Sequence, residues 1–108
     1  MATAQDLTNQ GFDLFAQGNV DEAIKTLKQA IEADPDYIEA YRNIAMMYGQ
    51  KGMLDEAVEA ARKVVEIDPD DTLGYVSLSM LLQRQGKIAE AEEAKAIGMT
   101  VQMRSHRR

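Results

Sequence analysis

The chain has 108 residues, of which 45% are hydrophobic and 28% are charged. This length fits a single domain, and this composition is typical of a folded globular protein and argues against disorder or a membrane span. The formal net charge of −6 disfavours binding to nucleic acid, whose phosphates attract basic surfaces, and the lack of cysteine excludes disulfides and thiolate metal sites.

Apolar residues recur every three or four positions along the chain, which is the spacing of one face of an α-helix. A clear example runs through Tyr41, Ile44, Ala45 and Tyr48. The pattern predicts an all-α fold with six helices, at about residues 4–17, 20–33, 37–51, 54–67, 71–85 and 88–104. Three of the expected helix starts carry an N-capping residue three positions ahead of an acid: Thr3 with Asp6, Asn19 with Glu22, and Asp36 with Glu39.

Short motifs return every 34 residues. The matching positions are Gly18, Gly52 and Gly86; Glu22, Glu56 and Glu90; Ala23, Ala57 and Ala91; and Pro35 and Pro69. A glycine tolerates the positive φ at which many helices end, and a proline cannot continue a helix. We therefore expect one domain of three two-helix units, at about residues 4–37, 38–71 and 72–105, with a short basic tail at the C-terminus.

The repeat changes character at the two ends of the chain. On the first helix of each unit, one face reads Ala40, Ile44 and Met47 in the second unit and Gly74, Leu78 and Leu81 in the third, but Asp6, Gln10 and Asp13 in the first. On the last helix, Glu92 and Lys95 replace residues that are apolar in the earlier units, whereas Ile88 stays apolar and is expected to keep its inward contact. Terminal units of helical repeat proteins carry such polar outer faces, so we expect a complete array of three repeats that is capped at both ends.

These residues resemble the tetratricopeptide repeat, whose pattern is W-x2-L-G-x2-Y, then A-x3-F, then P. The resemblance covers nearly the whole chain, and the second unit carries it through Tyr41, Ile44, Ala45, Tyr48, Ala57, Ala61 and Pro69. The third unit departs from the pattern at Lys95 and Met103. The resemblance implies an α-solenoid of helix-turn-helix repeats that binds a protein or peptide on a concave surface, which the first helix of each repeat lines.

The resemblance also implies which residues would contact a partner. The expected partner-binding residues are Asn9, Phe12, Arg42, Asn43, Met46, Leu73, Ser77, Met80 and Arg84. Equivalent positions hold Phe12, Met46 and Met80, which we expect to form an apolar ridge on the groove floor, where flexible methionines adapt to a ligand. The alternative is that this stripe belongs to the core. Asn43 lies where the family often hydrogen-bonds a peptide backbone; the alternative is an ordinary surface amide.

Some family members grip the C-terminal carboxylate of heat-shock chaperones with two lysines, an arginine and two asparagines. Only Asn43 matches that set here, and the other positions hold Thr8, Phe12, Leu73 and Ser77. Such chaperone tails are therefore disfavoured as ligands. Arg42 and Arg84 are either ordinary solvated arginines or contacts for an acidic group of a different ligand.

The sequence contains no residue pattern typical of an enzyme. It has no phosphate-binding loop, and the single histidine, His106, lies in the basic tail without metal-ligand spacing. The first residues do not form a secretory signal, and no run of about 18 apolar residues could span a membrane. We therefore expect a cytoplasmic adaptor or chaperone-like module that is not an enzyme, needs no cofactor or metal, and binds neither nucleic acid nor membrane.

A self-associating structural scaffold is the alternative to a binding module. Ile97 replaces the polar Gln29 and Lys63 of the earlier units, and Met99 and Met103 lie close to it in the sequence. These three residues are the expected contact between two copies of the chain.

Overall fold

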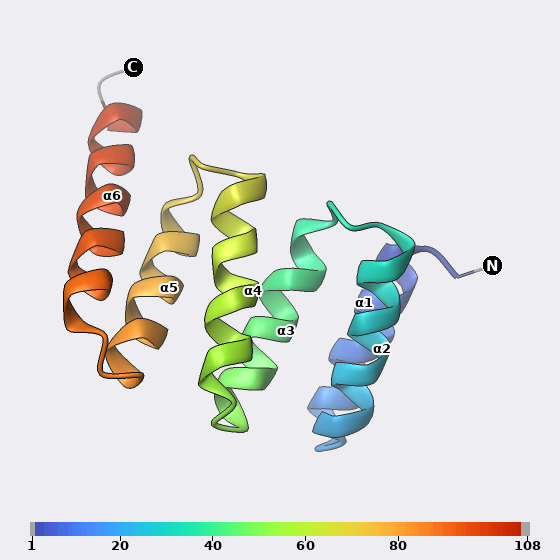
Figure 1. Ribbon diagram of the computed structural model, residues 1–108. Coiled ribbons are helices and arrows are strands. Elements are labelled where there is room, and N and C mark those ends of the chain that lie inside the picture. Colours follow the sequence, from blue (N-terminus) through green and yellow to red (C-terminus); the bar gives the residue numbers. More distant parts are fainter. Residues whose placement is uncertain (1, 107–108) are drawn as a thin grey trace.

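The computed structural model describes residues 2–106, which contain six helices and no strand. The helices are α1 (Ala4–Ala16), α2 (Val20–Ala33), α3 (Ile38–Gln50), α4 (Leu54–Ile67), α5 (Thr72–Arg84) and α6 (Ile88–His106). They form three antiparallel pairs that stack side by side in chain order (Figure 1). The all-α solenoid is confirmed, and each expected helix agrees with the observed one to within two residues at either end.

The two helices of a pair cross at small residues. Ala23, Ala57 and Ala91 have no exposed surface at all. Opposite Ala23 lies Gly11, where an added Cβ would come within 3.3 Å of the Ala23 carbonyl oxygen and 3.0 Å of Leu27 Cγ. The third pair carries Ser79 at this position, and its hydroxyl donates a hydrogen bond of 2.9 Å to the Ala91 carbonyl. A larger side chain at these crossings would push the helices of a pair apart.

Glycine ends the first helix of every pair. Gly18, Gly52 and Gly86 have φ values of +87°, +78° and +83°, as the repeat predicts. The N–H of the residue after Gly18 donates to the Leu14 carbonyl at 2.9 Å, and the same bond recurs after the other two glycines. The positive φ therefore reverses the chain while satisfying a carbonyl of the last helical turn.

Of the three predicted N-caps, two have the predicted position and one also forms the side-chain hydrogen bonds. Thr3 and Asp6 form a reciprocal capping box, each accepting the backbone N–H of the other at 3.1 Å. Asn19 is the N-cap of α2 as predicted, but its side chain makes no capping hydrogen bond, and the prediction for Asp36 is wrong. The backbone of Asn19 already closes the end of α1, and its ψ of 66° is not the extended conformation of most N-caps. The N-cap of α3 is Tyr37, one residue later than expected.

The first helix of the stack, α1, carries the predicted polar face. Asp6, Gln10 and Asp13 are exposed, whereas the equivalent residues of α3 and α5 are buried between neighbouring pairs. On α6, Glu92 and Lys95 are exposed as expected. The inward contact predicted for Ile88 is wrong, since more than half of its surface is exposed. Its equivalents Val20 and Leu54 pack against the core, and no described helix follows α6 to cover Ile88.

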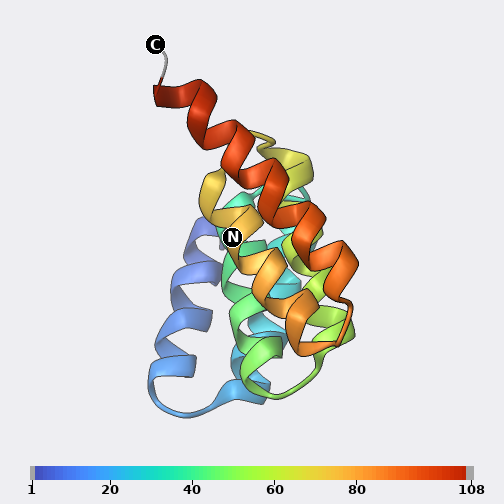
Figure 2. The same ribbon diagram turned by 90° about the vertical axis from the view of Figure 1, so that its left-hand side faces the viewer.

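The last helix is longer than its equivalents and extends beyond the stack (Figure 2). It has 19 residues, whereas α2 and α4 have 14 each. Proline follows the C-cap of α2 and of α4, but Met103 occupies the equivalent position, so nothing stops α6 there. Arg104 and His106 of the predicted basic tail are consequently helical and exposed, and Arg107 and Arg108 lie outside the described residues.

Replacing Ala57 by glutamate should abolish cooperative folding. Ala57 has no exposed surface and lies in the middle pair, so its carboxylate would be buried without a partner. We expect the free energy of unfolding to fall by at least about 4 kcal/mol, measured by circular dichroism in urea. Ala96→Glu is the matched control because Ala96 is exposed on α6, and it should leave the transition nearly unchanged. Wild-type stability of the Ala57→Glu variant would contradict the repeat register.

Candidate functional site

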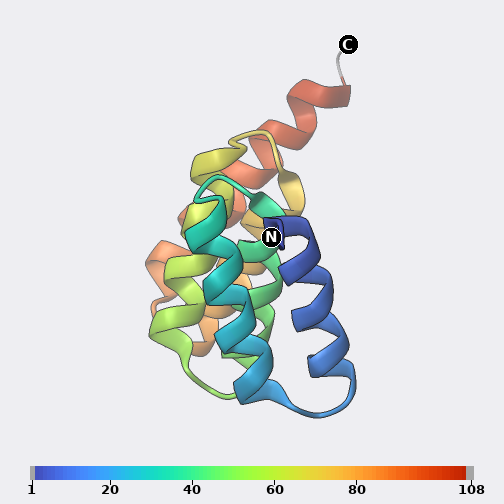
Figure 3. The same ribbon diagram turned by 90° about the vertical axis from the view of Figure 1, so that its right-hand side faces the viewer.

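The first helices of the three pairs are not evenly packed against one another. Viewed from the α1 end, the first and second helices of the pairs form two layers (Figure 3). Helix α1 packs against α3, whereas α3 and α5 make no comparable contact. Between α3 and α5 lies a pocket of about 500 Å³. The stack therefore opens between α3 and α5, along the surface that the family resemblance implies to be concave.

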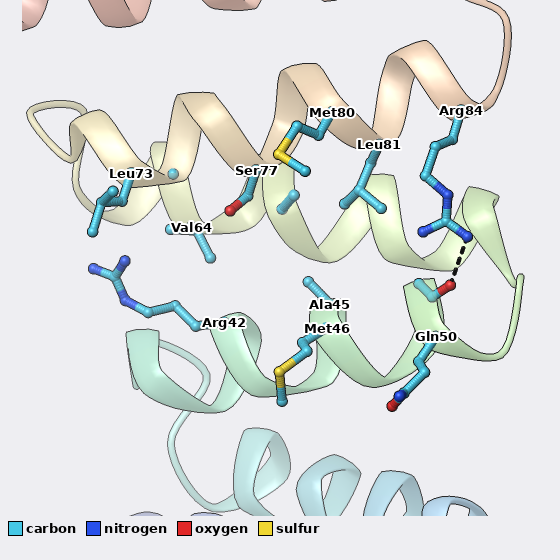
Figure 4. Close-up of a pocket in the computed structure, with 13 residues that line it drawn as sticks. Arg42, Ala45, Met46, Gln50, Val64, Leu73, Ser77, Met80, Leu81 and Arg84 are labelled. Atoms are coloured by element: carbon cyan, nitrogen blue, oxygen red, sulfur yellow. Dashed lines mark hydrogen bonds between the residues drawn. The ribbon is translucent and has the colours of Figure 1, made fainter.

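The pocket has apolar walls and floor (Figure 4). Met46 of α3 and Leu73, Met80 and Leu81 of α5 form the sides, and the floor comes from α4. The lining residues are Arg42, Ala45, Met46, Gly49, Gln50, Ala61, Val64, Leu73, Gly74, Ser77, Met80, Leu81 and Arg84. Six of the nine predicted partner-binding residues are among them: Arg42, Met46, Leu73, Ser77, Met80 and Arg84. The pocket can take up an apolar side chain of a ligand.

Two arginines are the only charged residues of this lining, and they lie at its opposite ends (Figure 4). Arg42 is neutralised, because its Nη1 lies 2.5 Å from Asp71 Oδ2 and its Nε lies 3.2 Å from Glu39 Oε1. Arg84 has no carboxylate within salt-bridge distance among residues 2–106. Its Nη2 instead donates a hydrogen bond of 2.9 Å to the Gly49 carbonyl in the last turn of α3.

Three predicted residues lie outside the pocket: Asn9, Phe12 and Asn43. Asn9 is exposed on α1. Phe12 is also exposed on α1, and its ring centroid lies 6.5 Å from that of Phe15. The side-chain amide of Asn43 donates a hydrogen bond of 2.8 Å to the Glu39 carbonyl of its own helix. One N–H of that amide is therefore engaged within α3, and the second N–H and the oxygen are left to meet a ligand.

The sequence prediction missed the small residues that make the hollow. The position of Gly49 is occupied by Phe15 in the first unit and by Gln83 in the third. A Cβ at Gly49 would lie 3.3 Å from Leu81 and 3.4 Å from Arg84 Nη1. A glycine at a position where the other units have a large residue is the signal in the sequence that could have pointed to this part of the lining. Ala61 and Val64 of the floor escaped notice because they also read as core.

The described residues offer no further reactive cluster. Residues 2–106 contain no group of three or more histidine, aspartate or glutamate side chains that could hold a metal ion. His106 is exposed in the last turn of α6. None of the helices in this range is long and apolar enough to cross a bilayer.

Comparison with protein families identifies the repeat. The family model of the tetratricopeptide repeat matches residues 14–75, which is more than half of the chain. None of the curated proteins matches the sequence significantly.

Many solved structures share the fold. A crystal structure of MamA superposes with a TM-score of 0.93 at 23% identity, covering 99% of this chain and 63% of that one. The second tetratricopeptide domain of Spaghetti (RPAP3), bound to the HSP90 peptide SRMEEVD, gives 0.84 at 20% identity, with 92% of each chain covered. YrrB, described as having an unusual peptide-binding site, gives 0.84 at 22%, with 94% and 53% covered. The chain thus spans less than two thirds of the MamA and YrrB structures.

Met46 and Met47 are adjacent on α3, but Met46 lines the pocket and Met47 lies in the core. Met46 is 44% exposed and Met47 is fully buried. Met47→Ala should therefore lower the free energy of unfolding by about 2–5 kcal/mol, and Met46→Ala by less than about 1 kcal/mol. Phe12→Ala and Met80→Ala should also fall in the lower range, because these side chains are 48% and 59% exposed. A loss of about 3–5 kcal/mol for Phe12→Ala would place the stripe in the core, contrary to our interpretation.

Proposed function

The chain belongs to the tetratricopeptide repeat family, and we propose that it is a protein-interaction module that holds a peptide or helical segment of a partner against α3 and α5. The observation that carries the proposal is the exposed apolar pocket between these two helices. An adaptor or chaperone-like role follows from such a module, and no catalytic activity is expected of it.

The exposure of the pocket's large apolar side chains supports this function. Met46, Leu73 and Met80 are all exposed large apolar residues that line it. Burying them against a partner would stabilise a complex by the hydrophobic effect, at about 25 cal/mol per Å² of apolar surface removed from water. Methionine side chains are flexible and polarisable, which suits a pocket that accepts ligands of different shapes. Two structural neighbours, the Spaghetti domain and YrrB, have peptide-binding sites in the same fold, which is in keeping with the proposal.

Self-association is a second candidate function, and the exposed apolar edge of the last pair favours it. Ile97, Met99 and Met103 are exposed on α6. Successive residues on a helix are rotated by about 100°, so Ile97 and Met99 point about 160° apart and cannot form one contact surface. Met99 instead lines a pocket of about 330 Å³ with Val76 and Met80 of α5, and Met103 lies one turn further along α6. A second copy would therefore bind at the α5–α6 edge.

The binding function predicts a selective loss of partners in Met46→Glu. A carboxylate in the middle of the apolar pocket would have to be desolvated against any apolar ligand group. We expect quantitative affinity capture from the source cell to lose a set of proteins with this variant, and to lose fewer with Phe12→Ala. Gln29→Glu, which adds the same charge at an exposed site on α2, should retain them. Identical capture by the wild type and Met46→Glu would refute the pocket as the binding site.

The self-association candidate predicts opposite behaviour of two residues on α6. Met99→Lys should convert a dimer into a monomer, whereas Ile97→Lys should behave as the wild type. Both side chains are exposed, at 56% for Met99 and 41% for Ile97, so Ile97→Lys is a control with a similar exposed apolar residue. Light scattering over a concentration series measures this, with circular dichroism to show that helicity is retained. A wild-type protein that stays monomeric throughout the series would eliminate the candidate.

A further inference from the structure

We propose that Arg84 is a specificity-determining residue that selects ligands carrying an aspartate or glutamate side chain next to the apolar residue in the α3–α5 pocket. This inference rests on the proposed binding function and adds the chemistry of the partner. It starts from a difference between the two arginines that line the pocket: Arg42 is paired with carboxylates, and Arg84 is not.

Arg42 and Arg84 have different capacities to bind a new anion. Arg42 lies within salt-bridge distance of both Glu39 and Asp71, and the Asp71 side chain is largely buried. A ligand carboxylate would have to displace these partners. Arg84 contacts no carboxylate within the described residues, and one of its nitrogens donates to a neutral carbonyl. The remaining N–H groups of its guanidinium are therefore available to a ligand.

The Gly49 carbonyl holds Arg84 in place before any ligand arrives. The bond of 2.9 Å ties the end of α5 to the last turn of α3, where carbonyl groups carry partial negative charge. The guanidinium and Leu81 both lie against Gly49, since a Cβ there would already contact Nη1 at 3.4 Å and Leu81 at 3.3 Å. A guanidinium that is already oriented loses less entropy on binding a carboxylate, and its planar fork can form two parallel hydrogen bonds.

The pocket around Arg84 is complementary to an apolar residue beside an acid. Met80 and Leu81 lie within one turn of Arg84 on α5, and no acidic residue lines the pocket. Arg84 and Gln50 are exposed at the same end (Figure 4), so a bound chain can continue past them into solvent. We therefore assign the carboxylate to an acidic side chain within the ligand and not to its C-terminus.

The test uses acetylated and amidated synthetic peptides that contain one central methionine or leucine. Glutamate, glutamine or lysine is placed at each neighbouring position in turn, and binding is measured by fluorescence anisotropy. We expect the best glutamate peptide to bind the wild type about tenfold more tightly than its glutamine counterpart, which corresponds to about 1.4 kcal/mol. In Arg84→Gln this preference should vanish, and in Arg84→Lys it should be reduced because the planar fork is lost.

Two controls separate a specific contact from a general effect. Arg104→Gln removes the same charge from an exposed position on α6 and should leave the tenfold preference intact. Thermal unfolding of Arg84→Gln checks that loss of the bond to Gly49 has not disturbed α3. A retained preference in a folded Arg84→Gln protein would overturn the inference.

The remaining outcomes distinguish failure of this inference from failure of the binding function. If the wild type binds the glutamate, glutamine and lysine peptides equally and Met46→Glu abolishes all binding, the pocket binds apolar peptides and the role of Arg84 is refuted. A parallel set of the same peptides is made with a free C-terminal carboxylate. If the amidated peptides show no glutamate preference and the free-acid forms bind about tenfold more tightly than the amidated ones, the assignment to an acidic side chain is wrong. If no peptide binding responds to Met46→Glu, the proposed function fails as well.

Discussion

The close crossing of the two helices in each pair is the constraint on which the whole stack depends. Ala23, Ala57 and Ala91 are completely buried, and Gly11 and Ser79 are the small residues opposite two of them. These small residues let the helices of a pair approach closely, and Leu27 fills the space against Gly11 in the first pair. The buried apolar residues of all three pairs form one core cluster, which includes the large side chains of Leu27, Met47 and Leu82. The tight pairs thus share a core, as in other repeat proteins whose stability comes from contacts of neighbouring repeats.

The pocket exists because the repeat is broken where α3 faces α5. On α1, Thr8 is small and buried, and its hydroxyl donates a hydrogen bond to the Ala4 carbonyl. The equivalent residue on α3 is Arg42, whose long side chain reaches Asp71 across the gap toward α5. Gly49 lies at the other end of the pocket, beside Arg84, and has no side chain. The repeated residues therefore maintain the scaffold, while the residues that differ between units shape the surface available to a partner.

The sequence predicted the fold well because burial in this molecule follows the helical period, and periodicity is visible in one dimension. The polar end face of α1 and the three positive-φ glycines were found for the same reason. Side-chain orientation was harder to predict. Asn19 is the N-cap of α2, but its side chain makes no capping hydrogen bond. Asn43 donates a hydrogen bond to its own helix, and Ile97 and Met99 lie on different sides of α6; the 34-residue period shows neither feature. The pocket was predicted only in part, because its floor residues Ala61 and Val64 also follow the pattern of core residues.

Overall charge and local charge act at different stages of the proposed binding. The net charge of −6 repels an acidic ligand at a distance, but screening at physiological salt limits that repulsion to about 8 Å. Within the pocket the ligand meets no acidic lining residue and one arginine that is held by a neutral carbonyl. Long-range charge mainly sets the rate of encounter, whereas contacts in the pocket set how long the complex survives. An acidic protein can therefore favour an acidic segment, provided that the carboxylate lies against Arg84 and its apolar neighbour fills the space beside Met80.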